Sequence, residues 1–448
     1  MRKMYMIALL TGLIANIYAQ DSTAKDIRTS SIDAIGARYV LQGPLVTFNY
    51  TGYGLNNYFS EEFYPGTTNR ITADFDYYTN SNSIPGSIVY KMIFKGEIKT
   101  PLKDRGLKGI KKQARFEDNM KTGVTYRHFF KNWDGIVLVG WHHREMRTIN
   151  LSKDAYHLLF YGNADFEDKT ADLSNLYFSN NIYNQLSLGI FKKVSYAKYQ
   201  MEFGFSGSFL QGINHQEIRT RNATIYTAPD GEYIDINYDL TFNNAREGAT
   251  SFSQVNGAGA SGDFHLAVGN NNKWKVAFDL SDVGYMTFRK TPVNYTAAKN
   301  VHFQGIVLPD LLTFSPATFD TLKVDDAVKS NLPTKSNNKY SIFLPFTAQL
   351  VYSMPVHRKV VLSVGAMYRY QPNYYLYGYA KVNYFITPTM VFSGSLGAGG
   401  YSKANLGVEF SKTWKYFDIT VGTSNLLGLV APAYLPGAAL FLRLGSSF

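Results

Sequence analysis

The feature that most constrains this chain is an alternation of apolar and polar side chains that recurs along most of its length. In residues 273–280 the two kinds of side chain take turns: Trp274, Val276 and Phe278 on one face, and Lys273, Lys275 and Asp279 on the other. The same period of two occurs in residues 198–209, 358–370 and 402–410. Apolar residues that recur at i+2 indicate strands, because a helix would repeat them at i+3 and i+4. The pattern therefore predicts an all-β protein.

The length of these segments separates a membrane barrel from a soluble sandwich. Most run for about nine to thirteen residues, which is the length that a tilted strand needs to cross a bilayer. Short polar connections alternate with long ones, and the long ones are 52–69, 100–115, 162–182, 244–261 and 289–339. This is the hairpin topology of a bacterial transmembrane antiparallel β-barrel with long extracellular loops.

We count about eighteen candidate strands. One is residues 87–99, where Ile88, Tyr90 and Met92 share a face opposite Lys91. Those around residues 214–242 form either a hairpin that extends beyond the membrane or no strands at all.

Composition agrees with a barrel. Aromatic residues make up 15% of the 448-residue chain, and they suit interfacial girdles on long strands. The mean hydropathy of −0.19 excludes a helical membrane bundle but not alternating strands. The chain has no cysteine, which excludes disulfides and thiolate metal sites. The net charge of +11 fits an anionic membrane surface, and we expect no nucleic-acid partner.

The first nineteen residues have the three parts of a secretory signal. Arg2 and Lys3 precede an apolar stretch from Met4 to Ala15, and Ile17-Tyr18-Ala19 fits a signal-peptidase site. The alternative is an N-terminal membrane anchor. We therefore predict a signal peptide over 1–19 with cleavage near Ala19, and an outer-membrane β-barrel over 20–448. After residue 20 no apolar run reaches the length of a spanning helix.

The last strand predicted carries the most specific local signal. Alternate residues from position 440 are apolar and the chain ends in an aromatic residue: Leu440, Leu442, Leu444 and Phe448. A terminal strand of this kind is typical of the signal that the barrel-insertion machinery reads. The alternative is an aromatic terminus that arose by chance on a soluble β protein.

No residue pattern points to catalysis, so we expect a non-enzymatic protein without metal or cofactor. His142 and His143 are adjacent in a predicted strand, so their side chains point to opposite faces and cannot easily chelate one ion. Asp325-Asp326 has no histidine partner that the sequence identifies. No G-x-S-x-G, H-E-x-x-H or P-loop motif occurs.

Two segments suggest contacts. Residues 95–115 are rich in lysine and arginine, and we interpret them as an extracellular rim that counters lipid phosphates; the alternative is docking of an acidic partner. The long segment 289–339 carries an apolar group that water would not leave bare: Phe303, Val307, Leu308, Leu311, Leu312 and Phe314. This group either enters the barrel mouth, binds a hydrophobic ligand or contacts a partner protein.

Several of these residues resemble an uncharacterised family of Bacteroidetes outer-membrane proteins. The matching positions are an Asp-x-Gly strand end and a Phe-x-Gly-Ile segment, with a Leu-Pro-Thr step before the later strands: Asp282 and Gly284; Phe303, Gly305 and Ile306; Leu332, Pro333 and Thr334. The segment 424–429 and the final strand ending in Phe448 also match, whereas Arg289-Lys290 stands where the family has a tryptophan-rich step. The similarity covers mainly residues 279–448.

That family is distantly similar to the PorP/SprF proteins of type IX secretion and to long-chain fatty-acid transporter barrels. The resemblance implies about fourteen strands, within a range of twelve to eighteen. It implies an anchor or scaffold in a surface assembly, whose partners are lipid, the insertion machinery and a second protein. The alternative is a transporter for a hydrophobic solute, and a barrel hydrolase would need a catalytic constellation that we do not find.

Overall fold

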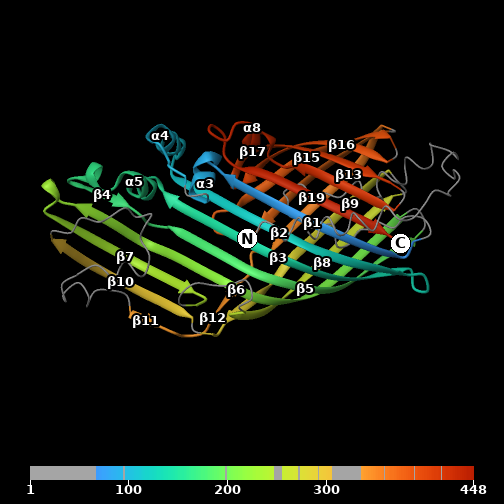
Figure 1. The fold of residues 1–448 in the computed structure, drawn as a ribbon, viewed down its shortest axis with the longest axis horizontal. Coiled ribbons are helices and arrows are strands. Elements are labelled where there is room, and N and C mark those ends of the chain that lie inside the picture. Colours follow the sequence, from blue (N-terminus) through green and yellow to red (C-terminus); the bar gives the residue numbers. More distant parts are fainter. Residues whose placement is uncertain are drawn as a thin grey trace.

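The computed structural model describes residues 67–93, 96–196, 199–246, 255–270, 273–290, 292–304, 334–357, 359–387, 389–414 and 416–448. It is a closed antiparallel barrel of 14 strands (Figure 1). This confirms the predicted fold class and strand number. The predicted signal peptide and its cleavage near Ala19 lie outside the described residues and stay predictions.

The barrel closes because the first strand pairs with both the second and the last. The barrel strands in sequence are β1 (Asn69–Ser81), β2 (Gln113–Phe130), β3 (Gly135–Ser152), β5 (Tyr177–Tyr196), β6 (Tyr199–Thr227), β8 (Gly257–Asn270), β9 (Trp274–Phe288), β13 (Thr347–His357), β14 (Val360–Arg369), β15 (Tyr375–Thr387), β16 (Met390–Gly400), β17 (Ser402–Thr413), β18 (Phe417–Thr423) and β19 (Ala438–Ser447). The seam joins Asn69–Ser81 to Ala438–Ser447 in antiparallel register. A closed sheet leaves no unpaired edge in lipid.

Alternation places apolar side chains outside and polar side chains inside. On β5, Leu186, Leu188 and Ile190 are exposed on the outer face while Gln185 and Ser187 are buried inside. The short β12 (Tyr340–Phe343) continues the wall beside β9. An apolar exterior around a polar interior is the inverse of a soluble barrel and matches a bilayer environment.

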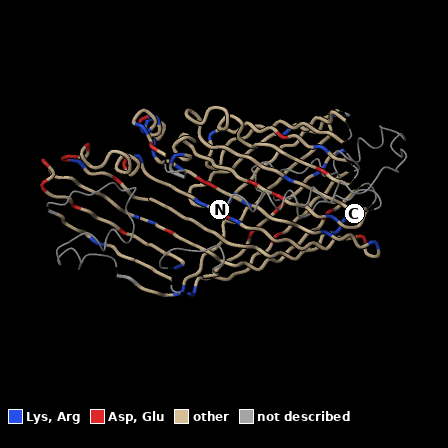
Figure 2. Tube along the Cα trace, viewed as in Figure 1, with Lys and Arg blue, Asp and Glu red and all other residues tan. Residues whose placement is uncertain are grey.

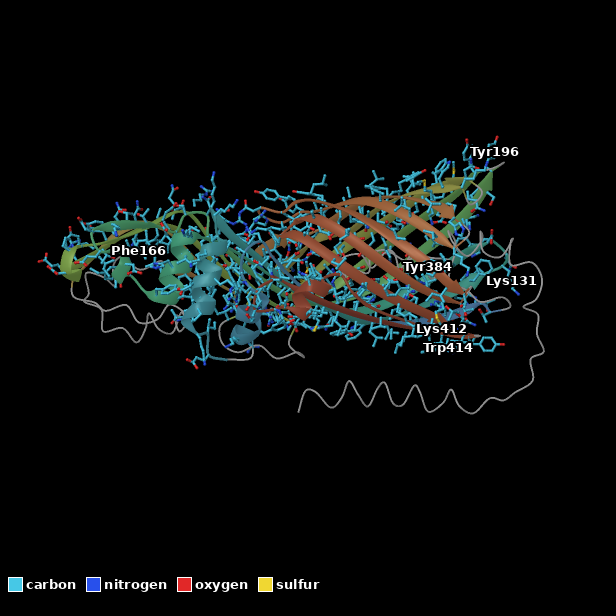
Figure 3. The ribbon with its side chains drawn as sticks, turned by 90° about the horizontal axis from the view of Figure 1, so that it is seen from above. Lys131, Phe166, Tyr196, Tyr384, Lys412 and Trp414 are labelled. Atoms are coloured by element: carbon cyan, nitrogen blue, oxygen red, sulfur yellow. The ribbon has the colours of Figure 1, made fainter. Side chains whose placement is uncertain are left out.

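One end of the barrel has short turns and an aromatic girdle. Strands β5 and β6 there are separated by two residues, and the chain ends at the same side (Figure 1). Figure 3 shows Tyr196, Tyr384 and Trp414 at this end, and all three side chains are exposed. Aromatic side chains gather at membrane interfaces because one part is apolar and another polar. This confirms the predicted short connections.

The other end carries an extension of the sheet. Strand β6 has 29 residues, and its second half pairs with β7 (Tyr233–Asn244). Strand β10 (Val293–Gln304) pairs with β7 along its full length. The edges are β4 (Lys169–Asp172) and β11 (Thr334–Ser336). The hairpin interpretation of residues 214–242 is thus confirmed. The prediction of one long connection over 289–339 was wrong for residues 293–304, which form a strand because β7 offers them an edge.

Helices cover the outer surface between barrel and extension. They are α3 (Gly86–Ile93), α4 (Thr100–Gly109), α5 (Lys153–Tyr161) and α8 (Leu426–Val430). The short η3 (Ala164–Phe166) and η4 (Pro229–Gly231) lie at the far end of the extension, where η4 forms the turn between β6 and β7. In the described part of the chain no helix is both long and apolar enough to cross a membrane.

The prediction of a strand at 87–99 was wrong, because this segment contains α3. Ile88 and Val89 are buried against Tyr156 and Phe160 of α5. These contacts with α5 stabilise a helix here. The period of two in the sequence extends over too few residues to be a strong signal for a strand.

Candidate functional site

The end of the barrel that carries the extension is called the outer end, and near it a buried arginine bridges the lumen. Arg369 at the end of β14 donates to the hydroxyl of Tyr78 on β1 at 2.6 Å and to Glu117 on β2 at 3.3 Å. Strands β15 to β19 separate β14 from β1 around the barrel, so this contact joins opposite walls. Arg369 and Glu117 are each 1% exposed. A buried guanidinium of this kind needs its carboxylate partner, since an unpaired charge there is costly.

A second bridge joins β3 to β9. Arg144 donates to the carboxylate of Asp282 at 2.9 Å, and Gln185 on β5 donates to the same carboxylate at 3.3 Å. Asp282 has a φ of 62°, and its backbone N–H donates to Asp263 on β8 at 2.7 Å. Here β9 holds an extra residue opposite β8, which is the geometry of a β-bulge that re-aims a side chain.

Gly284 explains the rest of the Asp-x-Gly signature. A Cβ at this position would lie 2.1 Å from the carbonyl oxygen of Ala260 on the paired strand. Only glycine permits that close approach of the two backbones. The sequence motif therefore marks a bulge that points a carboxylate into the lumen.

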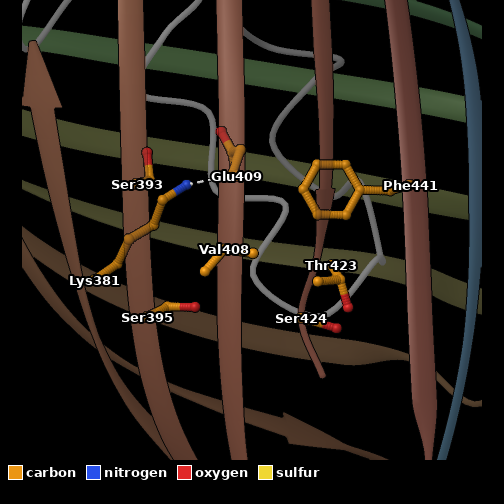
Figure 4. A pocket seen from close by; sticks show the side chains of 8 residues that line it. All are labelled: Lys381, Ser393, Ser395, Val408, Glu409, Thr423, Ser424 and Phe441. Carbon is orange, nitrogen blue, oxygen red and sulfur yellow. Dashed lines mark hydrogen bonds and ion pairs between the residues drawn. The ribbon is translucent and has the colours of Figure 1, made fainter. Parts of the chain in front are cut away.

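Ion pairs nearer the C-terminal end stay within the wall. Lys275 on β9 bonds Glu202 on β6 at 2.6 Å, and Arg70 on β1 bonds Asp418 on β18 at 2.8 Å. Lys381 on β15 bonds Glu409 on β17 at 2.8 Å. Figure 4 shows this last pair beside a small cavity lined also by Ser393. The cavity measures about 10 Å³, so it has room for about one water molecule.

A tyrosine-rich cluster lies under the turn that joins β14 to β15. Its buried members come from both walls: Tyr78, Val351, Met367, Tyr374, Tyr377, Tyr379, Tyr401 and Ala439. We call this set the mouth cluster. Buried tyrosines keep a hydroxyl that needs a hydrogen-bond partner. Asn405 on β17 supplies a long contact to Tyr377 at 3.5 Å, and the Tyr401 hydroxyl donates to the carbonyl of Pro372.

The turn itself reaches the opposite wall. Gln371 donates to Thr148 on β3 at 3.2 Å, and Arg115 on β2 donates to the carbonyl of Asn373 at 3.0 Å. The Arg115 guanidinium also lies 4.1 Å from the ring centroid of Tyr375. The turn therefore folds over the outer mouth and is fixed to the far strands. Together with the Arg369 bridge, the turn crosses the outer part of the lumen through contacts between described residues.

Candidate metal chemistry finds no support in the described ranges, where no group of three His, Asp or Glu side chains could hold an ion. His142 points inward to Asp74 at 3.3 Å and His143 contacts Asn184 at 2.9 Å on the other face. The pair therefore diverges as its strand position predicts. Asp325-Asp326 lies outside the described residues.

The predicted site residues have different outcomes. Leu440, Leu442 and Leu444 face outward on β19, and Phe448 ends the chain with 59% of its surface exposed; their recognition by the insertion machinery stays a prediction. Phe303 lies on β10 opposite Ile234 of β7. Its proposed companions Val307, Leu308, Leu311, Leu312 and Phe314 lie outside the described residues.

Sequence reasoning missed the cross-lumen bridges. Their only sequence signal is an inward-facing charge within an alternating strand, as at Arg144, Arg369 and Glu117. Such charges mark the lumen but do not reveal which of them meet.

These features define an integral barrel of the outer-membrane type, with a lipid-facing apolar wall and a charged, bridged interior. The chain belongs to the family described as "Family of unknown function (DUF5723)", whose model matches residues 68–424. The search of curated proteins found no match to this chain. The likeness to PorP/SprF proteins and the Bacteroidetes origin stay predictions.

Several solved structures are similar to this barrel at low identity. The toluene transporter TodX of Pseudomonas putida is 7% identical, with 85% of this chain and 88% of that chain covered and a TM-score of 0.41. The toluene transporter TbuX of Ralstonia pickettii is 9% identical, with 86% and 90% covered and a TM-score of 0.41. A FadL homologue of Pseudomonas aeruginosa is 8% identical, with 85% and 90% covered and a TM-score of 0.39.

Proposed function

We propose that this protein is a non-enzymatic outer-membrane anchor that presents its extracellular sheet to a protein partner, as in a type IX secretion-like or other surface assembly. The observation that carries the proposal is the bridging of the outer lumen by Arg369 and by the β14–β15 turn. Both contacts fix opposite walls together. Paired charges that cross the lumen stiffen the barrel and stand in the path of a solute, which suits a platform better than a channel.

The platform is the extension beyond the membrane. Strands β6, β7 and β10 continue there as one sheet, and α5 packs on it through Leu158 against Ala171, Ile225 and Ile234. This packing makes the extension an ordered surface and not a mobile loop. Figure 2 shows acidic residues at its far tip, where Glu167, Asp168, Asp230 and Glu232 are exposed. Such a tip would attract a basic partner.

A second candidate is uptake of a hydrophobic solute. The mouth cluster favours it, because five tyrosine rings converge there with aliphatic side chains. Ligand sites for apolar molecules are lined by aromatic groups with a few polar anchors. In this reading the β14–β15 turn would have to leave the far wall before a solute could enter.

One purification separates the two candidates. The full-length protein is extracted from outer membranes in mild detergent, and mass spectrometry identifies what stays bound. We expect a stoichiometric protein. Recovery of an apolar molecule without any protein would contradict anchoring and favour uptake.

A tip variant tests where the partner binds. We expect the variant E167Q/D168N/D230N/E232Q to lose its bound partner protein. Its barrel should stay folded, as judged by heat-dependent gel mobility. Asparagine tolerates the positive φ that Asp168 and Asp230 both adopt, so these changes remove charge with little strain. Full retention of the partner would exclude the acidic tip as its contact.

A further inference from the structure

Apolar side chains are exposed on α8 and on the segment that follows it. The exposed members are Leu427, Leu429, Val430, Tyr434 and Leu435, with Val430 at 76%. They continue the lipid-facing wall, where Leu396 on β16 and Leu440 on β19 are also exposed. Exposed apolar side chains beside a membrane-spanning wall are stabilised when they enter the acyl region. The segment 426–435 therefore marks the level at which the wall meets the outer end of the bilayer.

Helix α4 is fixed to this apolar segment. The guanidinium of Arg105 lies 4.2 Å from the ring centroid of Tyr434 and donates to the carbonyl of Ala433 at 2.7 Å. Figure 1 shows α4 and α8 on the same side of the barrel, with α4 farther from the C-terminal end. Helix α4 is thus held next to the membrane surface on the outer side.

This helix and the residues that flank it carry cations that have no partner among the described residues. Lys99, Lys108, Lys111 and Lys112 are exposed, and no hydrogen bond or ion pair reaches their side chains within the described part of the chain. Figure 2 shows the cluster of basic residues on α4. Lys108 also suits the negative end of the helix dipole, which is a structural reason for that one residue only.

Other cations of the same segment have structural roles. Lys103 donates to the carbonyl of Phe160 at 3.1 Å and Arg115 to that of Asn373. Asp104 accepts a hydrogen bond from Tyr161; burial first, and then this bond, raise the pKa of the Tyr161 phenol. The paired groups fix the helix in place, and the four lysines remain available to an anion.

We propose that α4 and α8 form a binding site for a phosphorylated glycolipid of the outer leaflet. The lysines at the end of α4 meet the lipid phosphates, and Leu427 and Val430 contact the acyl chains. Each lysine near an anionic surface strengthens binding about fivefold. The site depends on the orientation of the barrel in the membrane and is independent of the anchoring role.

The test titrates the purified full chain in detergent with bisphosphorylated lipid A and follows the complex by native mass spectrometry. We expect saturable binding that weakens at least about tenfold with dephosphorylated lipid A. We expect a loss of about tenfold or more in the variant K108Q/K111Q/K112Q. The wild-type comparison of the two lipids needs no variant to fold.

The matched control is K131Q/K273Q/K359Q, which removes three exposed lysines at the opposite, short-turn end. This variant should bind as the wild type does. Equal binding of both lipids by the wild type would overturn the proposal. So would equal affinities of the two triple variants when both run as folded barrels on unheated gels.

Discussion

At the scale of single residues, the interior depends on charges that meet across long sequence distances. Arg144 and Asp282 are 138 positions apart, and Arg369 and Glu117 are 252 apart. Asp282 reaches Arg144 only because a bulge holds its backbone at a φ of 62°. Asparagine and aspartate are the non-glycine residues that adopt this region with least strain.

Arg144→Met should destabilise the barrel more than loss of both partners does. The single change leaves Asp282 buried without its cation, at a cost of about 3–5 kcal/mol in the free energy of unfolding. Arg144→Met/Asp282→Asn should recover much of that loss. Urea unfolding in lipid vesicles, followed by tryptophan fluorescence, measures both values. A double variant no more stable than the single one would argue against the bridge.

Gly284→Ala should prevent correct pairing of β8 with β9. The added Cβ would overlap the carbonyl oxygen of Ala260 at 2.1 Å, and backbone atoms cannot move aside easily in a closed sheet. We expect little folded protein by heat-dependent gel mobility. Gly207→Ala is the control, since nothing lies within 4 Å of its Cβ position; equal yields of the two variants would refute the argument.

At the scale of elements, the β14–β15 turn behaves as a cover that is fixed to the opposite wall. Its contacts come from β2 and β3, through Arg115 and Thr148. The alternating strands supply inward polar groups at each level, and the turn uses those nearest the outer end. Helices α3 to α5 stay outside and pack on the wall, so they do not contribute to closure.

Removing the Arg369–Glu117 bridge without leaving an unpaired buried charge should loosen this cover. Arg369→Ala/Glu117→Gln deletes the bridge and neutralises the carboxylate together, which avoids an uncompensated buried charge. We expect single-channel conductance in planar bilayers to rise several-fold above the wild type. Lys412→Ala, an outward residue of β17 that bonds Thr389, is the control. An unchanged conductance in the double variant would show that other contacts suffice for closure.

At the scale of the whole molecule, closure of the sheet depends on both chain ends of the described region. The backbone of Phe448 exchanges two hydrogen bonds with that of Asn69, at 2.9 and 3.0 Å. The last residue thus completes the seam through its backbone while its ring stays exposed. Recognition of this exposed ring by the insertion machinery stays a prediction.

Phe448→Ala should lower the yield of inserted barrel several-fold while leaving the seam bonds in place. The expected loss comes from recognition of the ring and not from stability, so the protein that does insert should unfold at the wild-type urea concentration. Phe410→Ala, which removes an exposed aromatic ring from β17, is the matched control. Equal insertion of both variants would reject the terminal signal.

The sequence by itself determined the all-β class, the barrel and the face of most strands, because a side-chain period of two is a local property that burial outside and inside must obey. For residues 214–242 it left two alternatives open, a hairpin beyond the membrane or no strands, and the pairing of β6 with β7 decided for the hairpin. It misassigned residues 87–99, where contacts with α5 decide the helix. Only the tertiary structure decided that Arg369 meets Glu117 and that the β14–β15 turn crosses the mouth. Such pairings follow from the register at which fourteen strands close, and closure is a property of all strands together that no local pattern encodes.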